Sequence, residues 1–172
     1  MEHIYFPKIN ELKKNLAKLE NELGVSIKID GKMTEISGPG LEEYEAYMVL
    51  QAMAFGFSTK KALVLKSSDF QFKIIRIRDF TRKKNLKEVR ARIIGTNGRT
   101  LKTIKNLSNS EIILNEEENE IGIIALAESM DETLLALQNL IRGTKQSNVY
   151  YFLEKQNRTK KDHELGLKNS KY

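Results

Sequence analysis

The chain has 172 residues, a net charge of +6 and a hydrophobic content of 40%, which supplies enough apolar side chains for a core and excludes global disorder. It contains no cysteine, so disulfides, thiolate metal sites and thiol catalysis are excluded. No apolar run reaches the roughly 18 residues of a membrane span, and residues 1–7 lack the pattern of a signal peptide. We therefore expect one domain or two small ones in the cytoplasm.

The first third of the chain has the order strand, helix, strand, strand, helix. Apolar residues recur with helical spacing from Ile9 to Leu23, and Asn10 and Gly24 are residue types that begin and end helices. Asp30-Gly31 is a hairpin signal between two alternating segments. The expected elements are a strand at 3–6, a helix at 9–23, strands at 25–29 and 34–37, a helix at 41–55, and a turn with a short helix at 57–66.

A second series of elements follows. Arg76 and Arg78 alternate with Ile75 and Ile77, as in a strand with two arginines on one face. The expected elements are a strand at 70–80, a basic turn at 81–85, helices at 86–94 and 99–107, strands at 111–114 and 121–126, and a helix ending near Gly143. The hairpin and helix at 25–55 recur at 111–142 with an offset of about 85 to 87 residues, so the chain contains an internal repeat.

Positive charge is concentrated in the middle of the chain. Residues 73–105 carry 12 Lys and Arg against 2 Asp and Glu, whereas residues 1–72 have a net charge of −1 and residues 106–172 of −3. Such a block indicates a surface for an anionic partner, although a short charged run can also be a solvated helix face. We favour the anionic partner because the block surrounds the glycine motif described next.

The segment Gly95-Thr96-Asn97-Gly98 separates two expected helices. Glycine tolerates positive φ and has no Cβ, so a bulky group can approach the backbone closely. The start of the following helix offers unpaired N–H groups and a positive dipole end, which together form a seat for phosphate. Arg99 and Lys102 add charge there. A helical corner with glycines at a tight bend is the alternative explanation.

The string from Ile93 to Ile104, Ile-Ile-Gly-x-x-Gly-x-x-Leu-x-x-Ile, resembles the core of the KH domain, whose Gly-x-x-Gly loop clamps about four nucleotides. With the internal repeat, the resemblance implies an α+β fold of two tandem type I KH modules (β-α-α-β-β-α). Its first module is degenerate, because 9–23 contains no Gly-x-x-Gly. The expected domains are a degenerate module at 1–66, a KH module with a helical extension at 67–158, and a basic, disordered tail at 159–172.

Other segments resemble one family more specifically: 92–100, 56–58 with 62–65, and Gly143 with 149–154. They are similar to the archaeal and eukaryotic pre-ribosomal RNA processing KH proteins. The resemblance implies single-stranded RNA binding near the 3′ end of small-subunit ribosomal RNA during ribosome biogenesis. It also implies two protein partners, the rRNA-maturing endonuclease and the initiation factor two alpha subunit. From the residues themselves we expect no cofactor, no metal and no membrane. Members often keep a glycine loop in the first module, which this chain lacks.

In the expected mechanism, basic side chains neutralise phosphates while an apolar groove between Ile94, Leu101 and the strand 112–114 receives bases. Ordinary core positions are an equally good explanation for Ile94 and Ile112. The expected RNA-binding residues are Lys87, Arg90, Arg92, Ile94, Gly95, Thr96, Asn97, Gly98, Arg99, Lys102, Ile112 and Ile113.

Two other classes of protein remain as rivals. An enzyme is disfavoured because His3 and His163 lie near opposite ends of the chain, although a carboxylate metal site at 116–120 stays open. A protein adaptor with little direct RNA contact would use the aromatic segment 149–153 as an exposed anchor. We expect that segment to pack on the core as a terminal helix instead.

Overall fold

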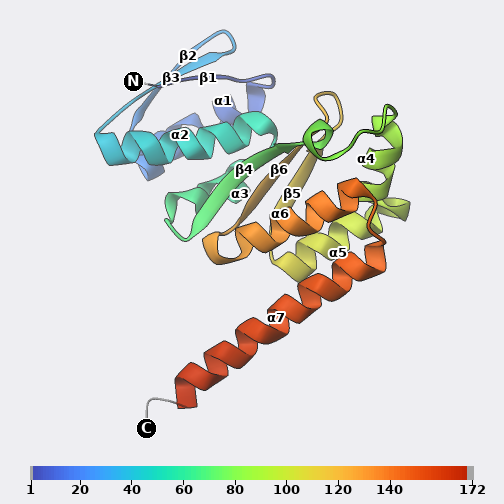
Figure 1. Ribbon diagram of the computed structural model, residues 1–172. Coiled ribbons are helices and arrows are strands. Elements are labelled where there is room, and N and C mark those ends of the chain that lie inside the picture. Colours follow the sequence, from blue (N-terminus) through green and yellow to red (C-terminus); the bar gives the residue numbers. More distant parts are fainter. Residues whose placement is uncertain (1, 170–172) are drawn as a thin grey trace. The chain divides into compact units, whose positions relative to one another are not determined.

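The computed structural model describes residues 2–169 of the chain, with side chains described as far as Gly166. Residues cluster into two compact units (Figure 1). Unit 1 comprises Met1–Lys73 with Gly122–Ile124, and unit 2 comprises Ile74–Ile121 with Ala125–Tyr172. The sequence-based boundary at 66/67 thus differs from the division at Lys73, and three residues of a later strand count with unit 1.

Unit 1 begins with a strand, one long helix and a hairpin. Its elements are β1 (Glu2–Tyr5), α1 (Asn10–Leu23), β2 (Ser26–Asp30), β3 (Met33–Ser37), α2 (Gly40–Phe55), α3 (Thr59–Ala62) and the 3-10 helix η1 (Leu63–Lys66). The sheet has the order β1-β3-β2 and is antiparallel, with Ile4 opposite Thr34 and Ile27 opposite Ile36. Alternate residues of each strand face α1 and α2, which explains the period-two pattern of the sequence.

The core of unit 1 lies between the helices and the sheet. Leu12, Leu19, Ile36, Val49 and Leu50 all have exposures of 0%. α1 ends at Gly24, whose φ of 68° is the left-handed conformation that glycine accepts most readily. The expected cap at Asn10 is wrong, because Ile9 occupies the N-cap position and makes no side-chain cap bond.

An aromatic cluster joins the end of α2 to the residues that follow it. The ring centroids of Phe55, Phe57 and Phe72 lie 5.9 to 6.2 Å apart. Gly122 is required beneath this cluster, because a Cβ there would meet the Phe55 ring at 2.5 Å. Residues 59–66 form the short helices α3 and η1, as expected for an ordered connector.

The second series contains an extra helix. Its elements are β4 (Phe70–Arg76), η2 (Ile77–Phe80), α4 (Leu86–Ile94), η3 (Thr96–Gly98), α5 (Arg99–Ser108), β5 (Glu111–Asn115), β6 (Glu120–Leu126), α6 (Ala127–Arg142) and α7 (Gln146–Asn169). The sheet has the order β4-β6-β5, in which the third strand lies in the centre just as β3 does in the first sheet. The expected strand at 70–80 is too long, because the chain turns into η2 at Ile77.

Helices α5, α6 and the first part of α7 pack together in unit 2 (Figure 1). Val149 and Leu153 of α7 are 2% exposed, and the Asn157 side-chain amide donates to the Leu107 carbonyl at 2.7 Å. Lys160 forms an ion pair with Glu132 at 2.8 Å. The expected packing of 149–153 is therefore what the structure shows.

The expected disordered tail at 159–172 differs from the structure, in which α7 continues to Asn169. Three side-chain bonds from Lys160 to residues at the start of α6 fasten this part of the helix, and a composition-based prediction does not see such tertiary contacts. Side chains 161–166 are all exposed. The rest of the tail, 170–172, lies outside the described residues.

Candidate nucleic-acid interface

The Gly-x-x-Gly motif forms the loop between α4 and α5. α4 stops at Gly95, whose φ of 73° and ψ of 175° suit glycine alone. Asn97 and Gly98 then adopt φ values of 52° and 72°, both left-handed, and α5 starts at Arg99. Asn tolerates this conformation better than most residues. The sequence therefore produces two helices with a sharp reversal between them.

Gly95 is held tightly against the first turn of α5. A Cβ at this position would lie 2.7 Å from the Thr100 Cβ and 2.8 Å from the Thr100 backbone nitrogen. Gly98 differs, since a Cβ there would meet no atom within 4 Å. Gly95 is thus a packing glycine, whereas Gly98 is needed only for its backbone conformation.

The tip of the loop faces solvent. Thr96 and Asn97 are exposed, while Gly95 and Gly98 are half-buried. Within the turn, the Gly98 N–H donates to the Gly95 carbonyl and the Arg99 N–H to the Thr96 carbonyl. Thr96 and Asn97 are the first residues of this turn. The first N–H groups of a helical turn have no acceptor within it. A phosphate at the tip would meet these amides directly.

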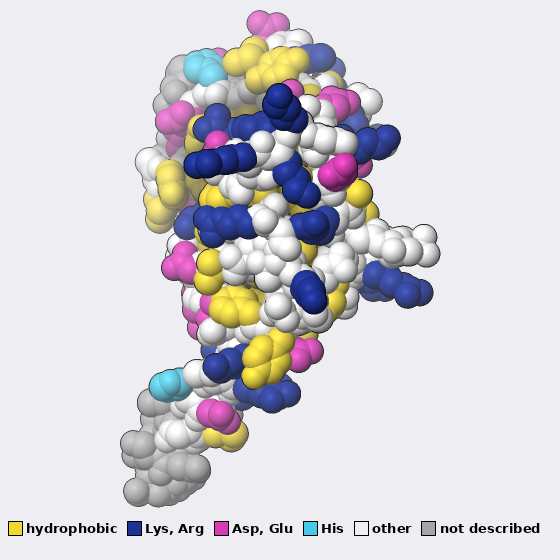
Figure 2. Space-filling view, turned by 45° about the vertical axis from the view of Figure 1, so that its right-hand side comes forward, with side chains coloured by type: hydrophobic (Ala, Val, Ile, Leu, Met, Phe, Trp, Pro, Cys, Tyr) yellow, Lys and Arg dark blue, Asp and Glu magenta, His cyan; other side chains and the backbone are white. Residues whose placement is uncertain are grey.

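Three expected phosphate contacts are exposed cations close to the loop in sequence. Lys87, Arg99 and Lys102 are exposed, and none of them has an ion-pair partner among the described residues. Figure 2 brings forward the side of the molecule where α4 lies in Figure 1, and dark blue Lys and Arg side chains are spread over most of that face. The positive charge predicted from residues 73–105 is thus carried at the surface.

Arg90 has a different role from the one expected. It is half-buried, donates to the Asn119 side-chain oxygen, and its Nε lies 3.9 Å from the Glu116 carboxylate. Asn119 in turn accepts from the Ile77 N–H at 2.9 Å through its carbonyl. Arg90 therefore fastens the turn between β5 and β6, and its guanidinium is engaged by protein groups.

Arg92 is half-buried at the other side of the loop. A Cβ on Gly143 would lie 2.9 Å from the Arg92 Nη1, so the guanidinium rests on the turn between α6 and α7. Its carbonyl oxygen accepts from the Gln146 side chain at 3.2 Å. Arg92 borders a hollow of about 580 Å³ with Thr144 and Lys145.

The apolar residues proposed for base contact divide into two sets. Ile94, Leu101 and Ile113 are half-buried, so part of each side chain is accessible. Ile112 is 1% exposed. The prediction for Ile112 is corrected, because neighbouring strand residues face opposite sides and this one faces the core. Ile113, its neighbour on the edge strand β5, faces the other side.

Two residues around the loop were missed by sequence reasoning. Thr100 is 3% exposed beneath Gly95, and its hydroxyl accepts from the Gln146 side chain at 2.8 Å. The sequence contains only a weak indication for Thr100, which is a small polar residue between basic residues at the helix start and is therefore compatible with burial. Gln146 carried none, because its contact with Thr100 spans 46 residues of sequence.

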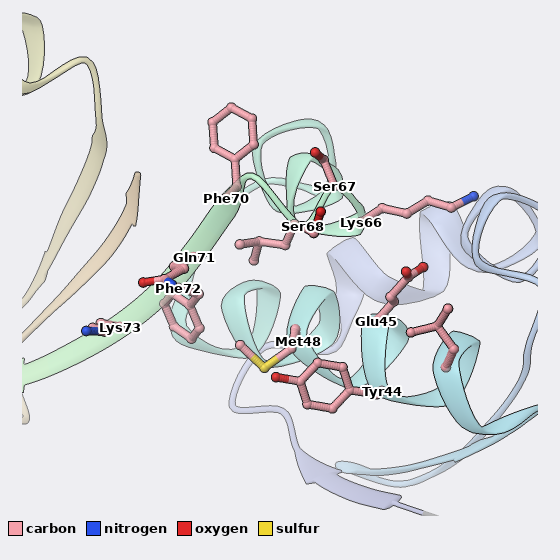
Figure 3. Close-up of a pocket in the computed structure, with 12 residues that line it drawn as sticks. Tyr44, Glu45, Met48, Lys66, Ser67, Ser68, Phe70, Gln71, Phe72 and Lys73 are labelled. Carbon is pink, nitrogen blue, oxygen red and sulfur yellow. The ribbon is translucent and has the colours of Figure 1, made fainter. Parts of the chain in front are cut away.

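Unit 1 has its own hollow, between α2 and the first residues of β4 (Figure 3). It measures about 460 Å³. The side chains of Tyr44, Met48 and Phe72 point toward one another across it, whereas the Lys66 ammonium points away and donates to the Glu22 carbonyl at 2.6 Å. No Gly-x-x-Gly loop occurs in unit 1, where α1 is a single uninterrupted helix of 14 residues.

Residues 2–169, which the structure describes, hold neither a cluster of metal-ligating side chains nor a helix suited to span a membrane. Among these residues, no three His, Cys, Asp or Glu side chains come together as metal ligands. None of the described helices combines the length and the apolar character needed to cross a bilayer.

The chain is similar to known proteins in sequence. Residues 71–158 match the family model described as a eukaryotic type KH-domain (KH-domain type I). A KH domain-containing protein of Methanocaldococcus jannaschii is 27% identical over 145 residues, or 80% of this chain. The alignment covers 63% of that protein, so the chain spans less than two thirds of this relative's length.

Solved structures agree with the fold. Dim2p from Pyrococcus horikoshii OT3 is 25% identical with a TM-score of 0.79, over 90% of this chain and 98% of that one. A chain in the a/eIF2alpha-aDim2p-rRNA complex from the same organism is 25% identical with a TM-score of 0.81, over 92% and 94%. A protein of unknown function from Aeropyrum pernix shares the fold at 24% identity, with a TM-score of 0.83 over 99% and 98%. The chain therefore belongs to the Dim2/Pno1-like proteins of the type I KH-domain family.

Proposed function

We propose that this protein binds single-stranded RNA in small ribosomal subunit biogenesis, and that the loop Gly95–Gly98 grips the RNA backbone. The observation that carries the proposal is the exposed pair Thr96 and Asn97, held between two glycines of positive φ at the start of α5. Backbone amides and a helix N-terminus at one exposed loop are the features that bind phosphate in proteins.

The neighbouring side chains fall into two groups, cations that meet phosphates and apolar groups that meet bases. Lys87, Arg99 and Lys102 neutralise adjacent phosphates, which makes binding weaken as salt concentration rises. The accessible parts of Ile94 and Ile113 receive unstacked bases. Base recognition then comes from groups on β5, the edge strand of the sheet.

We infer that the target lies near the 3′ end of small-subunit ribosomal RNA. The 3′ location rests on the family resemblance of the sequence. The rRNA target itself is supported by a structural relative, which occurs in a complex with rRNA and the alpha subunit of an initiation factor. On the same ground we propose the initiation factor two alpha subunit as a protein partner. The rRNA-maturing endonuclease is a further proposed partner, on the family resemblance of the sequence.

Ultraviolet crosslinking followed by sequencing of the RNA and mapping of the peptides tests the proposal. Crosslinked peptides are expected within residues 86–114, with RNA reads concentrated at the 3′ end of small-subunit rRNA. Crosslinks confined to peptides outside 86–114 would contradict the proposed grip.

The second candidate is a protein adaptor with little direct RNA contact. It is favoured by one observation on unit 1, where Leu41 and Tyr44 of α2 are 67% and 62% exposed beside the hollow of Figure 3. Exposed aromatic and aliphatic side chains around a pocket are typical of protein interfaces. The same crosslinking experiment separates the candidates, because an adaptor would give no RNA adducts near the Gly95–Gly98 loop.

A further inference from the structure

The first residue of α7 contacts both sides of the Gly95–Gly98 loop. The Gln146 Nε2 donates to the Thr100 hydroxyl at 2.8 Å and to the Arg92 carbonyl at 3.2 Å. Arg92 belongs to the last turn of α4, and Thr100 belongs to the first turn of α5. One side-chain amide therefore connects the two helices that the loop separates.

Thr100 is the residue on which Gly95 rests. Its backbone nitrogen would lie 2.8 Å from a Cβ at Gly95, so the position of Thr100 limits where the loop can begin. Thr100 is 3% exposed and Gln146 is half-buried, so this hydrogen bond is partly shielded from solvent.

The Arg92 carbonyl is equally in need of a partner. The last four carbonyls of a helix receive no hydrogen bond from within that helix. Arg92 is one of these four residues in α4, because the helix ends two residues later at Ile94. The Gln146 amide supplies a donor from a distant part of the chain. It adds a hydrogen-bonded link between the end of α4 and the start of α5, which also pack against each other.

We propose that Gln146 is a positioning residue of the RNA site. It holds the end of α4 and the start of α5 at the spacing that presents the amides of Thr96 and Asn97, and it does so without touching RNA. The inference rests on the proposed RNA-binding function. In this role Gln146, the first residue of α7, makes that helix contribute to the RNA site.

The test compares two contacts that α7 makes with α5 at different places. Gln146→Met keeps the length of the side chain and removes the donor. The matched control, Asn157→Ala, removes the bond to the Leu107 carbonyl near the far end of α5. If α7 only packs on unit 2, both variants should have the same effect.

Two measurements on the full chain decide the matter. Amide hydrogen exchange in the RNA-free protein is expected to accelerate at Gly98 and Arg99 in Gln146→Met and to stay unchanged there in Asn157→Ala. The dissociation constant for a single-stranded RNA oligonucleotide of the small-subunit rRNA 3′ region is expected to rise about three- to tenfold in Gln146→Met, the usual size of one lost hydrogen bond. It should rise less than twofold in Asn157→Ala.

A double-mutant cycle checks whether Gln146 acts through its hydrogen bond to Thr100. Thr100→Val removes the hydroxyl acceptor at nearly constant volume, and the double variant with Gln146→Met should lose no more affinity than the stronger single variant. Unchanged exchange at Gly98 and Arg99, or additive losses in the cycle, would overturn the proposal.

Failure of this inference is distinguishable from failure of the proposed function. If Thr96→Asp with Asn97→Asp abolishes RNA binding while Gln146→Met behaves as wild type, the loop binds RNA but Gln146 does not position it. If RNA binding is insensitive to every loop variant, the function fails. The exchange measurement, which needs no RNA, still decides the role of Gln146.

Discussion

Helix α1 of unit 1 and the pair α4–α5 of unit 2 occupy the same place in two series with the same strand order. α1 is one helix of 14 residues that ends at Gly24 and leads directly into a strand. α4 has 9 residues, ends at Gly95 and is followed after a three-residue turn by α5. The two series therefore share a sheet order and differ at the proposed RNA site, where the second series alone has an interrupted helix.

The polar side chains of the two regions are also used differently. Glu20 of α1 accepts from the Ile27 N–H at 2.8 Å, and Glu11 accepts from the Thr59 hydroxyl at 3.1 Å. These carboxylates hold unit 1 together and offset the lysines of the same helix. Lys87, Arg99 and Lys102, by contrast, have no ion-pair partner among the residues that the structure describes, so an anion can neutralise them.

The largest expected effect is a loss of folding stability, and it differs between the two glycines of the loop. Gly95→Ala should lower the free energy of unfolding by about 2–5 kcal/mol, because it combines a glycine-only conformation with overlap against Thr100. Gly98→Ala should cost only about 1–2 kcal/mol for its left-handed φ. Urea unfolding measures both values, and equal losses would contradict the packing role given to Gly95.

The second prediction concerns the tip of the loop. Thr96→Asp with Asn97→Asp should weaken binding of single-stranded RNA by about tenfold or more, because two carboxylates would face the phosphate. Fluorescence anisotropy with a labelled oligonucleotide gives the dissociation constant. Asn10→Asp with Asn21→Asp, two exposed positions of α1, is the control with equal added charge. If the loop double variant lost no more than about twofold in RNA affinity, the proposed binding of phosphate by the loop would be contradicted.

A smaller effect is expected for single cations. Arg99→Ala and Lys102→Ala should each weaken RNA binding a few-fold and reduce the salt slope by about 0.7, the value for one phosphate of a single strand. Arg90→Ala should instead lower thermal stability, since it releases the turn that holds Asn119. Titrations at several salt concentrations, with thermal melts alongside, test this contrast. A salt slope unchanged in Arg99→Ala and Lys102→Ala would show that neither side chain meets a phosphate.

The smallest effect is expected in unit 1. Replacing Lys13, Lys14 and Lys18 of α1 by alanine should change the RNA dissociation constant by less than about twofold, because α1 lacks the glycine loop. The triple variant Lys87→Ala, Arg99→Ala, Lys102→Ala removes the same charge from unit 2 and serves as the comparison. If both triple variants weakened binding equally, RNA attraction would depend on net charge rather than on the loop.

Much of the fold follows from local patterns in the sequence. The alternation at Ser26–Asp30 and the helical spacing in α1 each specify an element because one face must be buried. The glycine loop is predicted from its two glycines together with the apolar spacing on both sides of it. Local patterns failed at η2, where the expected strand ends early at Ile77, whose N–H bonds to the Asn119 carbonyl.

The site was less predictable than the fold. Thr96 and Asn97 are exposed, as expected for small polar residues in a short loop between two helices. Arg90 was assigned to RNA because charge is visible in a sequence and its partner Asn119, 29 residues away, is not. Ile112 was assigned to the groove because strand residues on opposite faces look alike until the sheet is known. Gln146 was missed for the reason that applies to Arg90, since long-range hydrogen bonds leave no local pattern.

The membership of Gly122–Ile124 in unit 1 has a consequence for how the protein is made. The ring of Phe55 lies over Gly122, so the amino-terminal unit is incomplete until strand β6 has left the ribosome. Translation thus produces most of the second series before the first can finish packing, and a fragment ending at Lys66 or Lys73 would leave the aromatic cluster uncovered.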